Sequence, residues 1–317
     1  MAANVERMAF VGQLPWHGEG TEILDADVYD IDKCIKSAGM DWEVNLKSLQ
    51  TVDGEAVNHR ACYRVSDNKI LGVVGPKWTP VQNWDMFKWF QPWLDAKECA
   101  VHTAGSLCGG TKVWVLCQVV KNPLMTIAKN DDVAKFVLLA NSHDGSLAVR
   151  AGFTPIRVVC TNTLAAAMHN AASKLIRIRH SAKVLKNMDL VKDIMDLANQ
   201  EFEATAEQYR FLASRQVHTG DLRKYVKIIL DVENVKDDEL PTRTKNIMDE
   251  MFKMIVEGRG QDNPATQGTY WQAYNGVNEY LNYVKGRNTS NRMDSLWFGA
   301  NATANQKALD IAMKMAG

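Results

Sequence analysis

The chain has 317 residues, of which 46% are hydrophobic and 23% charged, and its formal net charge is zero. This composition is ordinary for a globular protein with one large or two modest domains, and it excludes a chain that attracts nucleic acid through its overall charge. No apolar run is long enough for a signal peptide, and none reaches the length of about eighteen residues typical of a membrane span. We therefore expect a cytoplasmic protein.

The first elements predicted along the chain belong to a mixed helix and sheet fold. A loop rich in Pro and Gly at residues 13–20 precedes an expected helix within residues 25–39, which ends at Gly39. Alternating apolar and polar residues then predict three antiparallel strands between residues 42 and 74, joined by Asp-Gly and Asp-Asn turns. A short helix follows with Asn83 as its expected N-cap and Pro92 disturbing its end.

Four tryptophans occur within sixteen residues around this helix, and their pattern has two interpretations. They are Trp78, Trp84, Trp89 and Trp93. Aromatic side chains can stack on the bases of a single strand, but aromatics at helical spacing more often seal a core. We favour the core for most of them.

Two further hairpins are expected, one around the glycine-rich turn near Gly109 and one through His143, Asp144 and Gly145. The chain after Pro155 starts extended and is expected to become helical after Thr161 or Asn162. Residues 176–181 then alternate as a short strand with Arg177 and Arg179 on one face. From about residue 188 the periodicity predicts a series of amphipathic helices.

This order indicates an α+β fold: an antiparallel β-sheet with packed helices, followed by a helical C-terminal part. We place a soft boundary near residue 187, which separates a sheet-bearing core at residues 1–187 from a mainly helical region at residues 188–317. No linker composition separates the two, so we expect them to pack together.

One stretch, residues 145–188, contains no acid, although about five would be expected from the composition. Its basic residues are Arg150, Arg157, Lys174, Arg177, Arg179, Lys183 and Lys186. A segment of one sign in a neutral chain indicates a site for an anion, and the alternative is that these residues pair with acids elsewhere in the fold.

The sequence shows no recognisable catalytic motif. Residues 105–112 resemble a phosphate-binding loop, but the Lys-Thr order is reversed and the segment joins two strands. The acids are scattered, and His17 and the pair His143-Asp144 are isolated polar groups at turns. The six cysteines include no C-x-x-C pair and are expected to be reduced core thiols. We therefore predict a protein that is not an enzyme and that uses no metal or cofactor.

Four motifs, in order, resemble the phage/plasmid-like protein family of unknown function. They are PWHGEG near the start, KWTPVQN at 77–83, PIRVVCTNTL at 155–164 and TYWQAYNGVNEYLNYV at 269–284. The resemblance covers nearly the full chain and implies a mobile-element context. In that context, the predicted sheet, helix and basic segment are similar to the single-strand annealing proteins of the RecT, Erf and lambda Beta kind.

The main hypothesis is therefore a phage-encoded, oligomeric protein that binds and anneals single-stranded DNA as a ring or filament. The basic residues of the 145–188 stretch would contact phosphates, and Tyr63 and Trp78 would stack on bases. Arg223, Lys224 and Lys227 could add contacts. The alternative is an interaction protein that binds a host or phage protein through its C-terminal helices, where Met248, Met251 and Met254 suggest an adaptable face unless they are core. An enzyme with an unfamiliar site is the last alternative.

Overall fold

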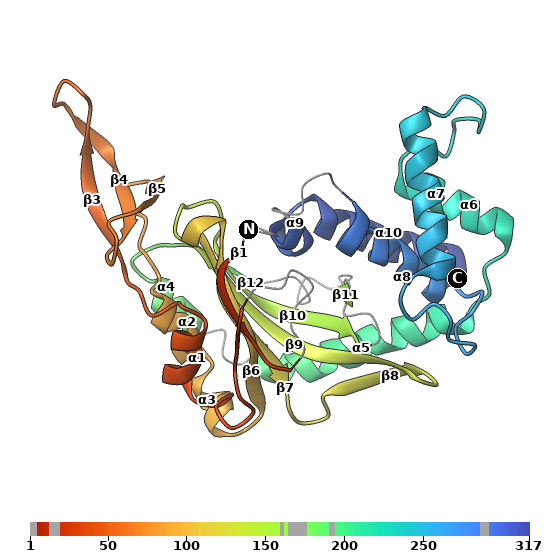
Figure 1. Ribbon diagram of the computed structural model, residues 1–317, viewed down its shortest axis with the longest axis horizontal. Coiled ribbons are helices and arrows are strands. Elements are labelled where there is room, and N and C mark those ends of the chain that lie inside the picture. The colour runs from red at the N-terminus through yellow and green to blue at the C-terminus, as the bar shows by residue number, and fades with distance from the viewer. Residues whose placement is uncertain (1–4, 13–19, 159–161, 164–175, 190–193, 286–291) are drawn as a thin grey trace.

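The structure is a computed structural model that describes residues 5–12, 20–158, 162–163, 176–189, 194–285 and 292–317. It confirms the α+β class and the helical C-terminal part (Figure 1). A nine-stranded sheet has the order β11-β10-β9-β7-β6-β1-β2, with β12 also on β10 and β8 also on β9. Its strands are β1 Val5–Phe10, β2 Thr21–Glu22, β6 Cys99–Leu107, β7 Lys112–Val119, β8 Leu124–Ala128, β9 Asp131–Ser142, β10 Val149–Arg157, β11 Asn162–Thr163 and β12 Ile176–Ile178. All pairs are antiparallel except β1 with β2.

Both faces of this sheet are buried, which explains why β9 is apolar almost throughout rather than alternating. Val137 and Leu139 face one core, which the N-terminal helices and α5 share. Phe136 and Leu138 face the opposite core, to which Trp297 of the C-terminal part also belongs. The two predicted hairpins are confirmed as β6–β7 and β9–β10, and Gly109 and Gly110 adopt the positive φ that the first turn requires.

A second sheet of three strands projects from the first (Figure 1). Its strands are β3 Val44–Gln50, β4 Ala56–Arg64 and β5 Ile70–Val74, as the alternation predicted. Arg64 attaches it to β1 by donating to Glu6 at 2.9 and 3.1 Å. Gly72 lies against the β9–β10 turn so closely that a Cβ there would come within 2.4 Å of the Asp144 Cα. Only glycine permits this approach.

Short helices cover one end of the large sheet: α1 Ile31–Ser37, α2 Asn83–Trp89, α3 Gln91–Asp95 and α4 Val184–Asp189. The expected cap of α2 was off by one residue. Gln82 is the N-cap and forms a capping box with Asp85, while Asn83 is buried in the first turn. Among the tryptophans, Trp89 and Trp93 are core, as favoured, and Trp84 is exposed.

The C-terminal region is helical, as predicted. It contains α5 Ile194–Ser214, α6 Thr219–Ile229, α7 Thr242–Glu257, α8 Tyr270–Glu279 with a π-helical turn Tyr280–Val284, α9 Arg292–Phe298 and α10 Ala300–Ala316. Helix α5 packs on β8 and β10, and α8 packs on β11. Met248 and Met251 are buried core residues of α7, which removes them as an exposed methionine face. The predicted helix after Asn162 begins instead with strand β11, and residues 164–175 lie outside the described part.

Candidate nucleic-acid interface

The short strand β12 places Arg177 on one face and its two isoleucines on the other, as the alternation predicted, but it ends at Ile178, before Arg179. Ile176 and Ile178 belong to the core on one face, and Arg177 is exposed on the other. Arg177 lies directly opposite Arg150 of β10 in the antiparallel register. Directly opposed residues project to the same face, so these two guanidinium groups share one side of the sheet edge. Arg150 is half-buried, with its guanidinium 5.3 Å from the ring centroid of Phe298.

Three more cations follow along the same segment. Arg179 lies two residues after Arg177, Lys183 immediately precedes α4, and Lys186 lies within α4; all three are exposed. In the part of the chain that the structure describes, Arg177, Arg179, Lys183 and Lys186 lie in no ion pair and carry no hydrogen-bonded carboxylate. Among the described residues, therefore, no acid pairs with any of these four cations. Lys174, the remaining candidate, lies outside the described residues.

Trp78 joins this basic edge through His180, the residue after Arg179. The two rings are stacked with centroids 4.7 Å apart and planes at 21°. Trp78 is half-buried and packs on the core that also contains Ile178, so it lies on the face of the sheet opposite to Arg177. The geometry therefore brings one of the two predicted stacking residues to the basic segment.

The segment that carries Trp78, residues 77–83, is tied to its surroundings at nearly every position. The Thr79 carbonyl accepts from Nδ1 of His180 at 2.9 Å, and the Val81 carbonyl accepts from Asn141. Gln82 exchanges two hydrogen bonds of 2.9 Å with the backbone of Val44. The KWTPVQN motif thus connects the small sheet, α2 and the segment that follows β12.

Two histidines that are far apart along the chain contact this segment, the buried His143 and the half-buried His180. Asn83 donates through Nδ2 to the Met40 and Trp42 carbonyls, so its Oδ1 accepts from Nε2 of His143 at 3.0 Å. Burial lowers the pKa of His143 to about 3, and burial is also the main cause that lowers the pKa of His180. Both rings are therefore neutral near pH 7. His180 contacts the Trp78 ring and the Thr79 carbonyl, whereas His143 contacts Asn83 and the Trp42 ring.

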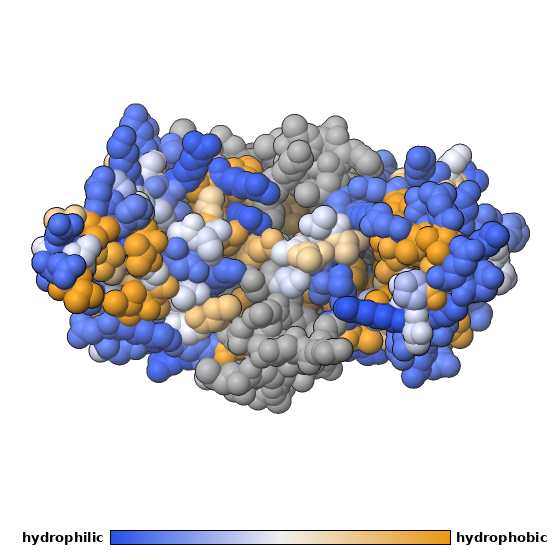
Figure 2. Space-filling view, turned by 90° about the horizontal axis from the view of Figure 1, so that it is seen from above, coloured by the Kyte–Doolittle hydropathy of each residue, from blue (hydrophilic) through white to orange (hydrophobic). Residues whose placement is uncertain are grey.

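Tyr63 does not belong to this edge. It lies on β4 three positions from Arg60, whose guanidinium bonds to the Trp78 carbonyl at 2.7 Å. An odd separation in a strand places two side chains on opposite faces, so Tyr63 faces away from Trp78. Its ring is covered by the Lys47 ammonium at 4.6 Å from the centroid, and its cross-strand neighbour Ile70 is exposed. Figure 2 shows apolar side chains gathered at this projecting end of the molecule.

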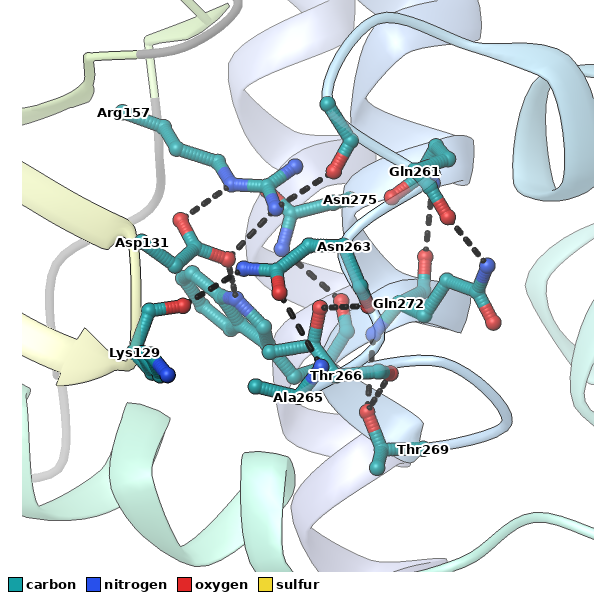
Figure 3. A network of polar contacts seen from close by, with 12 residues as sticks. Lys129, Asp131, Arg157, Gln261, Asn263, Ala265, Thr266, Thr269, Gln272 and Asn275 are labelled. Atoms are coloured by element: carbon teal, nitrogen blue, oxygen red, sulfur yellow. Dashed lines mark hydrogen bonds and ion pairs between the residues drawn. The ribbon is translucent and has the colours of Figure 1, made fainter.

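Arg157 was wrongly expected to contact phosphates. It is fully buried and forms an ion pair with the equally buried Asp131, with Nε donating at 2.8 Å. The Trp271 indole N–H also donates to Asp131 at 2.8 Å, and Arg157 donates to the Gly260 carbonyl at 3.0 Å (Figure 3). The pair thus joins the sheet to the helical part, and its guanidinium is inaccessible to an anion.

The surrounding polar network in Figure 3 reinforces this junction. Gln261 and Gln272 exchange reciprocal bonds of 2.9 Å between side-chain amides and backbone carbonyls. Asn263 donates to the Lys129 carbonyl at 2.9 Å, from the loop before α8 to the turn before β9. Buried polar groups are tolerated when they are bonded in this way, so the network fixes how α8 sits against the sheet.

Arg223 and Lys227, which could have added contacts to the nucleic acid, both form ion pairs with Asp237, at 2.8 and 3.3 Å.

The described cysteines form no disulfide, as expected, and Cys160 lies outside the described residues. Among the described residues, no three His, Cys, Asp or Glu side chains are grouped in a way that could hold a metal ion. No described helix has the length and apolar character needed to cross a membrane.

Comparison with known proteins adds a family. The model of the family described as "Domain of unknown function (DUF932)" matches residues 70–297, which is more than half of the chain. The chain belongs to this family. Neither a curated protein nor a solved structure matches the chain.

The DUF932 match confirms the expectation of a family without an established function. It includes the segment with Trp78, the basic strand and the junction of Asp131 with Arg157, whereas Tyr63 precedes it. The interface candidate that remains within the DUF932 region consists of Arg150, Arg177, Arg179, Lys183 and Lys186 with Trp78. Below, these six residues are called the basic edge.

Proposed function

We propose that this protein binds single-stranded nucleic acid along the basic edge, as a phage-encoded protein of the host cytoplasm that pairs or protects DNA during recombination or replication. The observation that carries the proposal is a run of exposed cations, Arg177 in β12 and Arg179, Lys183 and Lys186 after it, without carboxylate partners among the described residues, in the segment whose His180 stacks on Trp78. Cations that follow a backbone and an aromatic ring that stacks on a base are the two parts of a single-strand site.

The binding expected of such an edge is electrostatic and independent of sequence. Each phosphate that a cation neutralises releases counterions, so the affinity falls with salt by a log–log slope of about −0.7 per contact on single strands. Four exposed cations, Arg177, Arg179, Lys183 and Lys186, predict a slope of about −2.8. The neutral net charge of the chain means that this term comes from the edge rather than from the whole molecule.

The test is a titration of labelled oligonucleotide at several salt concentrations, with a charge-matched control. Replacing Arg177 and Arg179 by Gln should weaken binding to all sequences alike and reduce the slope to about −1.4. The control replaces Lys236 and Lys253 by Gln, because these exposed lysines of the helical region carry the same charge away from the edge. An absence of binding at low salt, or equal losses in both double variants, would contradict the proposal.

We further propose that the protein assembles into a ring or filament on its single strand, as the annealing proteins it resembles do. One protomer offers four exposed cations in a short segment, which supports only a few phosphate contacts. Several protomers along one strand would multiply that modest affinity through effective concentration. Negative-stain images and mass photometry with and without oligonucleotide test this step, and a monomer that stays monomeric on bound DNA would refute it.

A further inference from the structure

A cavity of about 470 Å³ lies between helices α6, α8 and α10, within the C-terminal region. Its lining comes from matched faces of two helices. On α6, the lining positions 221, 224 and 228 follow one another at intervals of three and four residues. On α10, positions 314 and 315 lie three and four residues after position 311. Residues at these spacings lie on one side of a helix, so each helix turns a single continuous face to the cavity. The volume is within the range of sites for small molecules, about 300–1,000 Å³.

The walls of the cavity are apolar. Ile228 of α6 and Ile311 and Met315 of α10 are half-buried and line it. Tyr270, the first residue of α8, also lines it with only 4% of its surface exposed. Such walls favour the apolar body of a ligand over water, and methionine adapts to its shape.

The charged residues at the cavity are mostly positive. Lys224 stands on the α6 wall and Lys314 on the α10 wall, both exposed. Among the described residues neither lysine has an ion-pair partner, in contrast to Arg223 and Lys227 on the neighbouring side of α6, which share Asp237. Asp221 is the only acid among the described residues of the lining. Two cations and one acid leave a net positive site that suits one negative group.

Tyr270 supplies a hydrogen-bond donor at the cavity. Its backbone is fixed because its N–H donates to the Arg215 carbonyl at 2.9 Å, next to the Thr269 cap of α8. Its ring is buried, but its hydroxyl oxygen is not among the buried unpartnered atoms and has no protein partner within the described ranges, so it is open to the cavity. A phenol that lines a cavity without a partner is a donor available to a bound anion.

We propose that this cavity binds a small amphipathic anion, with one carboxylate, sulfonate or phosphate group held between Lys224, Lys314 and the Tyr270 hydroxyl and an apolar body against Ile228, Ile311 and Met315. This site is separate from the basic edge, and the proposal does not depend on nucleic-acid binding. Apolar walls give the affinity and the three polar groups orient the head.

Titration of the full chain with anilinonaphthalene sulfonate, a fluorescent amphipathic anion, tests the site. We expect one saturable component per chain that decanoate displaces and inorganic phosphate at equal concentration does not, because phosphate lacks the apolar body. Replacing Lys224 and Lys314 together by Gln should weaken this component about tenfold. The Lys236 and Lys253 double variant is the control with the same charge change and should bind as the parent does.

Two more variants test the geometry. Tyr270→Phe keeps the ring and removes the donor, so it should weaken the probe several-fold without lowering the unfolding temperature. Ile228→Trp should fill the cavity and abolish the saturable component. Equal affinity in the two lysine double variants would overturn the proposal, and so would displacement by phosphate as effective as by decanoate. If Ile228→Trp does not fold, the lysine and tyrosine variants decide by themselves.

Discussion

The buried ion pair between Arg157 and Asp131 provides the sharpest test of how this fold is held together. We consider Arg157→Met, which keeps the aliphatic volume and removes the charge. Both side chains are fully buried, and Asp131 accepts from Arg157 and from the Trp271 indole. Without the guanidinium, the carboxylate keeps one neutral donor and no countercharge.

The expected loss of stability is large. Removing one partner of a buried pair typically costs about 3–5 kcal/mol, since the remaining charge stays desolvated. At about 2 °C per kcal/mol for a chain of this size, the unfolding temperature should fall by about 6–10 °C. The double variant Arg157→Met with Asp131→Leu should recover part of the loss, because no charge is left, although the Trp271 N–H then lacks its acceptor.

Thermal and guanidinium unfolding followed by circular dichroism measures these differences. Oligonucleotide affinity should stay unchanged for the folded fraction, because Arg157 lies away from solvent. The reasoning would be refuted if Arg157→Met lost less than about 1 kcal/mol, or if it remained folded and lost nucleic-acid binding selectively. The second result would mean that Arg157 contacts nucleic acid at the surface, as the acid-free stretch around it suggested.

Three other outcomes are expected. The free energy of unfolding should fall as the pH drops from 6.5 towards 3, because the unfolded chain binds a proton at His143 that the folded chain, in which the His143 pKa is about 3, does not bind. The expected loss at pH 5 is about 2 kcal/mol. In His143→Gln, the free energies of unfolding at pH 7 and pH 5 should therefore differ by less than they do in the parent protein. Gly276→Ala should destabilise by about 1–3 kcal/mol, because a Cβ would come within 2.3 Å of the Ile255 Cα, whereas Gly220→Ala, with no atom within 4 Å of its Cβ, should be neutral or slightly stabilising. Trp78→Ala should weaken oligonucleotide binding by about 1–3 kcal/mol and Trp78→Phe by less, and equal affinity in all three proteins would leave Trp78 a purely structural role.

Local patterns in the sequence were sufficient for much of the fold. Period-two alternation located the small sheet and β12, and it assigned Ile176, Ile178 and Arg177 to the correct faces. Turn residues placed the β9–β10 hairpin at His143 to Gly145. These features depend on residues within a few positions of each other, so the sequence displays them directly.

The site depended on distant partners. Arg157 and Arg177 look alike in the acid-free stretch, but the antiparallel register of β9 and β10 sets Arg157 opposite Val133 and next to Asp131, whereas Arg177 of β12 lies opposite Arg150. Trp78 belongs to the basic edge because His180 stacks on it. Tyr63 does not belong to the basic edge, because it lies on the face of β4 opposite to Arg60, which bonds to the Trp78 carbonyl.

The sequence by itself therefore determined most element types, though not the strands β1, β2 and β11, as well as the antiparallel sheet and the presence of an unbalanced positive segment. Only the tertiary structure decided which of those cations face solvent. The physical reason is that a charge is neutralised by whatever lies within a few ångströms of it in space, and strand register and helix packing, not proximity along the chain, bring that partner there.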